Sequence, residues 1–144
     1  MSIIEVEKKH RMNFAEFYYE YTVQESDIDF NNHMNNVAYF NLINNVAEAH
    51  WAHIASPFFV EKYNWVARRH EIDYLASCFE GDLLSVKTWI GEPTGATWWR
   101  FYSITRVSDN KMIAKAQTNW VLLNLETKRP TRITEEVINI FVAK

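Results

Sequence analysis

The spacing of hydrophobic residues changes twice along the chain, and each change predicts a different kind of element. Over residues 13–23, aromatic and β-branched residues occupy every second position, which is typical of a strand. From Asn36 to Ala55 the apolar positions recur every three or four residues, opposite a stripe of asparagines and Glu48, which predicts a helix that Pro57 ends. We expect its apolar face to comprise Tyr39, Phe40, Ile43, Val46, Ala47, His50, Trp51 and Ile54.

After residue 64 the spacing returns to two. It predicts further strands over residues 65–75, 83–90, 97–107 and 112–125, joined mostly by tight turns such as Gly91–Gly95. A short helical turn is expected within 58–64, a charged bend over 126–132 and a helix over 134–142 capped by Thr134. This order predicts one α+β domain over residues 1–144, with a five-stranded antiparallel sheet wrapped around a long central helix.

Composition limits the possible functions. With 144 residues, 48% of them hydrophobic, the chain can build a substantial core. A net charge of −3 argues against nucleic acid as a partner, because phosphate binding needs a basic face. The single cysteine fits a reducing compartment, and no signal peptide or membrane span is visible, so we expect a cytoplasmic protein.

The densest polar stretch, Ser26 to Tyr39, joins the first strand to the helix. It holds two carboxylates, one imidazole and four carboxamides, more than a helix cap requires. Asp29 precedes the helix start, whose unpaired amides can stabilise an anion on a carbonyl oxygen. A carboxylate beside such donors can attack a carbonyl or activate water, and His33, Asn31 and Asn36 could orient the reactants. These residues best support acyl transfer to water, with no cofactor or metal.

The same residues, Asp27-Ile28-Asp29-Phe30-Asn31-Asn32-His33-Met34-Asn35-Asn36-Val37-Ala38-Tyr39, form a recognisable pattern. It resembles the D-x-D-x-N-x-H-x-N-N-x-x-Y signature of hotdog-fold thioesterases of the 4-hydroxybenzoyl-CoA type, and especially the acyl-ACP thioesterases. The resemblance implies a sheet around a central helix and hydrolysis of acyl-CoA or acyl-ACP. It also implies a homodimer or homotetramer with sites at the subunit interface, and catalysis by Asp29 with Asn31 and His33.

Two positions depart from that family. The acyl-ACP enzymes carry a glutamate before a cysteine on a later strand, whereas Ser77 precedes Cys78 here. The family's more usual glycine before the histidine is replaced by Asn32. These departures favour a simpler site built from Asp29 and the helix amides.

Other residues and activities remain open. Arg68 and Arg69 could bind the phosphates of CoA or of a carrier protein. Tyr39 is a further substrate-binding candidate with core packing as its alternative, and Glu48 is a rival carboxylate within the helix. A hotdog enoyl-thioester hydratase also pairs Asp with His, but usually in a D-x-N-P-x-H setting that this chain lacks. A non-catalytic acyl-group binder is the third possibility.

Overall fold

The computed structural model describes residues 13–144; the charged segment 1–12 predicted as a lead-in lies outside this range. In chain order the elements are β1 (Phe17–Thr22), the 3-10 helix η1 (Glu25–Asp27), α2 (Asn36–Ile54), α3 (Pro57–Lys62), β2 (Tyr63–Tyr74), β3 (Leu83–Ile90), β4 (Thr97–Arg106), β5 (Lys111–Asn124), β6 (Arg129–Pro130) and α4 (Glu135–Ile140).

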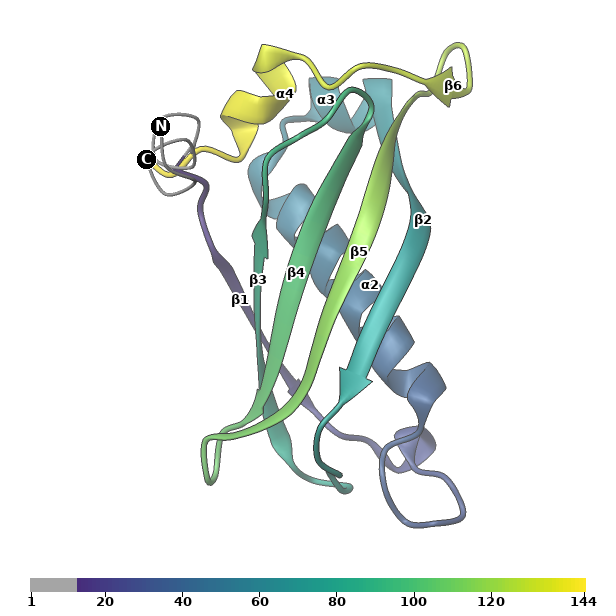
Figure 1. Cartoon of the computed structure of the whole chain (residues 1–144), viewed down its shortest axis with the longest axis vertical. Coiled ribbons are helices and arrows are strands. Elements are labelled where there is room, and N and C mark those ends of the chain that lie inside the picture. The colour runs from purple at the N-terminus through teal and green to yellow at the C-terminus, as the bar shows by residue number, and fades with distance from the viewer. Residues whose placement is uncertain (1–12) are drawn as a thin grey trace, which may run out of the picture.

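One curved antiparallel sheet surrounds the long helix. The strand order is β1-β3-β4-β5-β2, and the two-residue strand β6 adds to β5. Figure 1 shows α2 lying along one face of this sheet, with α3 and α4 at the end where the helix finishes. The predicted α+β architecture is confirmed, with β6 as a small addition to the five expected strands.

The helix follows its predicted span closely. Its buried residues include Leu42 and Ile43, at 3% and 0% exposure, whereas Phe40, predicted on the apolar face, is 39% exposed. Leu42 lies three residues after Tyr39 and therefore belongs to the same stripe. Pro57 both follows the end of α2 and occupies the first turn of α3, where a missing N–H costs nothing.

Alternation along β4 decides which side chains meet the helix. Trp98, Arg100, Tyr102 and Ile104 are all buried, while the residues between them are partly exposed. Trp98 and Tyr102 stand opposite Trp120 and Ala116 of β5. The buried side chains of β4 are therefore mostly apolar, and Arg100 is the one charged residue among them.

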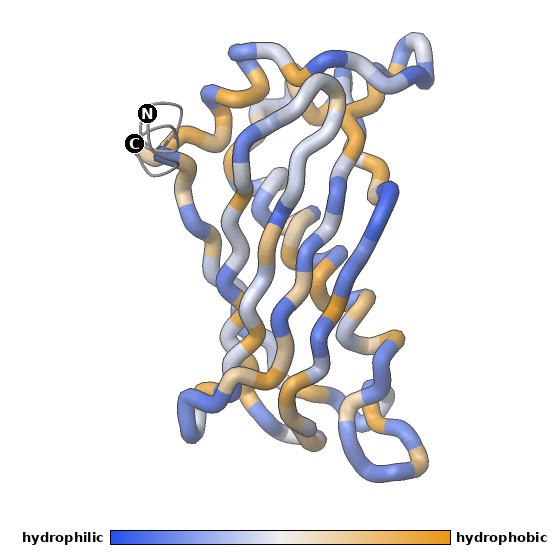
Figure 2. The backbone as a smooth tube through the Cα atoms, in the orientation of Figure 1, coloured by the Kyte–Doolittle hydropathy of each residue, from blue (hydrophilic) through white to orange (hydrophobic). Residues whose placement is uncertain are grey.

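Within residues 13–144, no helix combines the length and apolar content that a membrane crossing needs. Figure 2 shows hydrophilic residues concentrated in the connection between β1 and α2 and along the middle of β2. The first of these segments is the polar stretch that the sequence singles out.

Candidate active site

Asp27 anchors the connection between β1 and α2. Its Oδ2 accepts hydrogen bonds from the Tyr21 hydroxyl at 2.5 Å and from the Gln24 amide at 2.8 Å. Burial and this bond to Asp27 raise the pKa of Tyr21 to about 12, so the phenol stays a donor. The carboxylate of Asp27 is thus occupied in holding η1 against β1.

The next eight residues, 28–35, form a tight loop that ends at the helix. The Asp29 amide donates to the His33 carbonyl at 3.1 Å, and the Asn32 amide donates back to the Asp29 carbonyl at 3.0 Å. Asn32 has φ of 66°, in the left-handed region where glycine is easiest and asparagine next best. The turn geometry therefore explains why asparagine can replace the more usual glycine here.

Asn35 caps the helix. Its Oδ1 accepts from the Ala38 amide at 2.8 Å, and its Nδ2 donates to the Asp27 carbonyl at 2.7 Å. Among the residues that the structure describes, the amides of Asn36 and Val37 have no hydrogen-bond acceptor. Two free N–H groups therefore face outward at the positive end of a 19-residue helix.

Asp29 has one engaged and one available carboxylate oxygen. Oδ1 accepts from the Asn31 amide at 2.8 Å, whereas Oδ2 lies 4.0 Å from His33 Nδ1. The side chains of Asp29 and His33 are 27% and 40% exposed. The carboxylate is therefore held in place by the backbone, and an imidazole stands close enough to be bridged by water.

An open hollow of about 610 Å³ collects these groups. It is lined by Ser26, Asp27, Asp29, His33, Asn35, Asn36, Val37, Ala38 and Asn41. Asp29, His33 and the two residues that carry the free helix amides thus line one space, which can hold the reacting part of a carbonyl compound. Asn31 lies outside this lining and contributes its backbone amide to Asp29.

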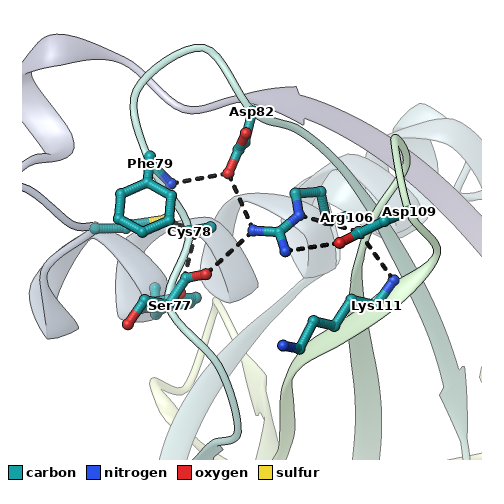
Figure 3. Close-up of polar contacts among 9 residues, drawn as sticks. Ser77, Cys78, Phe79, Asp82, Arg106, Asp109 and Lys111 are labelled. Carbon is teal, nitrogen blue, oxygen red and sulfur yellow. Dashed lines mark hydrogen bonds and ion pairs between the residues drawn. The ribbon is translucent and has the colours of Figure 1, made fainter.

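The loop that carries Ser77 and Cys78 closes the other side of the junction. Figure 3 shows Arg106 beside this loop. Its Nη1 donates to the Ser77 carbonyl at 3.2 Å and to Asp82 Oδ2 at 3.4 Å. The same guanidinium forms a two-pronged pair with Asp109, at 3.0 and 2.8 Å. The loop in turn accepts the Met34 amide at the Cys78 carbonyl, 2.9 Å away, and so supports the site loop.

Cys78 and Tyr39 are packed together in the core. The Tyr39 hydroxyl lies 3.2 Å from Cys78 Sγ, and the two residues are 3% and 0% exposed. Burial raises the pKa of both groups, so both stay neutral. Neither side chain lines the hollow.

The remaining candidates lie away from Asp29. Arg68 stands at the point where the pairing of β2 with β5 shifts register, and Arg69 pairs with Glu71 at 2.9 Å on the exposed face of β2. Glu48, on the second half of α2, lines a separate cavity.

That second cavity contains Arg100, which the sequence analysis did not single out. The alternating pattern of β4 could have indicated this residue, because Arg100 occupies an inward position between Trp98 and Tyr102. A charge in an apolar stripe indicates either a buried partner or a ligand site.

A long helix enclosed by a curved antiparallel sheet, with a polar site at the helix start, is the architecture of a hotdog fold. The family model described as the acyl-ACP thioesterase N-terminal domain matches residues 15–141, so the chain belongs to that family. No curated protein sequence matches significantly.

Solved structures share the architecture at low identity. A 1,4-dihydroxy-2-naphthoyl-CoA thioesterase from Synechocystis is 19% identical with a TM-score of 0.76, over 88% of this chain and 96% of that one. A Staphylococcus aureus protein solved in complex with CoA is 22% identical with a TM-score of 0.77, over 91% and 84%. An aspartate-to-asparagine variant of 4-hydroxybenzoyl-CoA thioesterase, complexed with 4-hydroxybenzoyl-CoA, is 12% identical with a TM-score of 0.79, over 88% and 98%.

Proposed function

We propose that this protein hydrolyses acyl thioesters of CoA or of acyl carrier protein to a free acid and a thiol, using Asp29. The observation that carries the proposal is the shared hollow, which brings the Asp29 carboxylate, His33 and the start of α2 together. Membership in the acyl-ACP thioesterase family supports the same reaction class. A carboxylate for attack and donors for the oxyanion are the two parts that thioester hydrolysis needs.

In the general-base route, Asp29 Oδ2 takes a proton from water while the water oxygen bonds to the thioester carbon. The carbonyl oxygen becomes an oxyanion and accepts hydrogen bonds from the Asn36 and Val37 amides. Collapse of this intermediate breaks the carbon–sulfur bond, and protonated Asp29 returns the proton to the departing thiolate. In the alternative route, Asp29 attacks the carbon itself and water then hydrolyses the acyl-aspartate anhydride.

Each neighbour would have a different part in this reaction. His33, 4.0 Å from Asp29, would orient the attacking water, and Asn31 would hold the carboxylate through its amide. Tyr39 would pack beneath the site together with Cys78 rather than touch substrate. Arg68 and Arg69 would meet phosphates of the carrier from the edge of β2, outside the hollow.

We further propose a homodimer or homotetramer in which another subunit covers the hollow. Phe30, next to Asp29 in the chain, and Val37, which lines the hollow, are 94% and 67% exposed. Apolar side chains this exposed at a polar site are typical of a surface that another chain covers. The acyl group would then lie between subunits.

The test is thiol release from acyl-CoA and acyl-ACP panels of graded chain length. Asp29→Asn keeps an oxygen that can accept from the Asn31 amide but cannot take a proton, so we expect kcat to fall by about 100-fold or more. Asp73→Asn makes the same exchange at an exposed aspartate on β2. It is the matched control and should hydrolyse thioesters as fast as the parent. Equal rates for Asp29→Asn and the parent would show that another group activates water.

Two further readouts separate the other two candidate activities. Loss of enoyl absorbance without thiol release would indicate the hydratase, and saturable acyl-CoA binding without either change would indicate an acyl-group binder. Single turnover in ¹⁸O-water distinguishes the two hydrolytic routes, because only the covalent route can leave label in Asp29.

A further inference from the structure

Arg100 is a buried cation without a counter-ion. It is 4% exposed, and both of its side-chain hydrogen bonds use Nη1, to His50 Nδ1 and to Thr88 Oγ1, each at 3.0 Å. Within residues 13–144 no carboxylate forms an ion pair with it. Its Nε and Nη2 groups therefore have no acceptor in this part of the chain.

The two hydrogen-bond partners of Arg100 do not neutralise its charge. Burial and the positive charge of Arg100 lower the pKa of His50 to about 3, so the imidazole is neutral and acts only as an acceptor. Burial lowers the pKa of Arg100 to about 10, which still leaves the guanidinium charged at neutral pH. A buried charge in this state is costly unless an anion approaches it.

A cavity of about 90 Å³ gives an anion access to Arg100. It is lined by Ala47, Glu48, Trp51, Asn64, Trp65, Ile90, Trp98, Arg100, Trp120 and Phe141. The side chains of Glu48 and Asn64 are exposed while Arg100 is buried, so the cavity leads from the surface into the core.

A second unpaired donor lines the same cavity. Trp65 Nε1 is buried without a hydrogen-bond partner among the described residues. The indoles of Trp98 and Trp120, by contrast, donate to the Gly91 carbonyl and the Tyr102 hydroxyl. An unpaired indole N–H and an unpaired guanidinium edge lie among aromatic rings. This setting suits a ligand with a charged acceptor group at one end and an apolar group at the other.

We propose that this cavity binds a small monocarboxylate, whose oxygens accept from Arg100 and Trp65 and whose short tail packs against the indole rings. The cavity, of about 90 Å³, is small and suits a short carboxylate such as propionate. The site is separate from the proposed hydrolytic hollow: Ala47 follows Asn41, the last helical residue that lines the hollow, by six residues, which is about 9 Å along α2.

Binding is tested on the full chain without any thioester. Propionate replaces chloride at constant ionic strength while tryptophan fluorescence is followed, since four indoles line the cavity. We expect a saturable change that propionamide, the neutral analogue, does not produce, and weaker binding of hexanoate because of its length. No saturable change, an equal response to propionamide, or tighter binding of hexanoate would overturn the proposal.

Variants separate the site from general effects. Arg100→Gln should weaken propionate binding by at least about tenfold, and Trp65→Phe, which removes only the N–H donor from an aromatic ring, by about threefold. Trp65→Phe also keeps the test open if Arg100→Gln does not fold. Arg129→Gln, at an exposed arginine outside the cavity, should bind like the parent.

Glu48 provides one more control, because it is the only carboxylate among the described residues that line the cavity. Glu48→Gln removes a negative charge that would repel the propionate carboxylate, so this variant should bind propionate at least as tightly as the parent. Weaker binding by Glu48→Gln, or unchanged binding by both Arg100→Gln and Trp65→Phe, would overturn the assignment. Because none of these readouts requires hydrolysis, they succeed or fail independently of the proposed thioesterase activity.

Discussion

At the scale of single residues, two aspartates only two positions apart have different surroundings. Asp27 uses its carboxylate to hold Tyr21 and the Gln24 amide. Asp29 uses one oxygen for the Asn31 amide and leaves the other beside His33. The hydrogen bonds therefore separate a structural carboxylate from an available one, a distinction that residue type alone does not make.

His50 makes the folded state sensitive to acid. Its pKa is about 3 in the folded protein and about 6.5 in an unfolded chain, so between these values the unfolded chain binds the extra proton. We therefore expect this residue to lower the free energy of unfolding as pH falls from 6.5 towards 3, by up to about 1.4 kcal/mol per pH unit. Urea unfolding at several pH values, in buffers free of carboxylates, measures the slope.

His50→Gln keeps a side-chain acceptor for Arg100 but cannot titrate, so its stability should vary less with pH than that of the parent. His53→Gln, an exposed histidine one turn further along α2, serves as the control and should keep the parent slope. Identical slopes for the parent and His50→Gln would contradict the burial argument.

Sequence patterns single out the stretch around Asp29 but not the cavity that contains Arg100. The Asp29 site is local, because fourteen consecutive residues carry its groups and the family resemblance. The Arg100 cavity collects side chains from α2, β2, β3, β4, β5 and the segment after α4, so only the folded sheet brings them together. Similarly, the unpaired state of Trp65 Nε1 depends on distant neighbours and has no sequence signal.

At the scale of elements, the start of α2 organises the site. Asn35→Ala removes the acceptor for the Ala38 amide and the bond from Nδ2 to the Asp27 carbonyl. We expect a loss of about 1 kcal/mol in the free energy of unfolding, as for other helix caps. Asn36→Ala, at the exposed first helical position, is the matched control and should change stability by less than half as much; chemical denaturation compares the two.

Equal losses for the two variants would mean that Asn35 does not act as the cap. The sequence has asparagines at both positions, and the structure identifies Asn35 as the cap by its two hydrogen bonds. Helix and strand periods also place the long elements well: β3 spans the predicted residues 83–90, and α2 ends one residue early.

Short elements were harder to predict. The first strand was expected over 13–23 but spans only Phe17–Thr22, because β1 pairs with β3 over just those six residues. The helix η1 and strand β6 contain three and two residues, too few for any periodic signal. The register shift near Arg68 is also invisible in a pattern of apolar residues.

At the scale of the whole molecule, the two edges of the sheet are unequal. β1 has six residues, whereas β2 has twelve, and within the described chain β2 pairs on one side only, with β5. Val66 on β2 and Leu75 just after it are 43% and 53% exposed. A long edge strand with exposed apolar side chains is a surface on which another chain can add.

We therefore expect this edge to form the subunit contact of the proposed oligomer. Val66→Lys combined with Leu75→Lys places two charges along the edge and should shift the assembly towards the 17.1 kDa monomer in light scattering. Because the proposed site lies between subunits, thioester hydrolysis should fall together with the mass. Leu83→Lys combined with Val107→Lys adds the same charge at exposed apolar positions on β3 and after β4, and should leave the mass unchanged. A parent that is already monomeric at working concentrations, yet hydrolyses thioesters, would show that one chain completes the site alone.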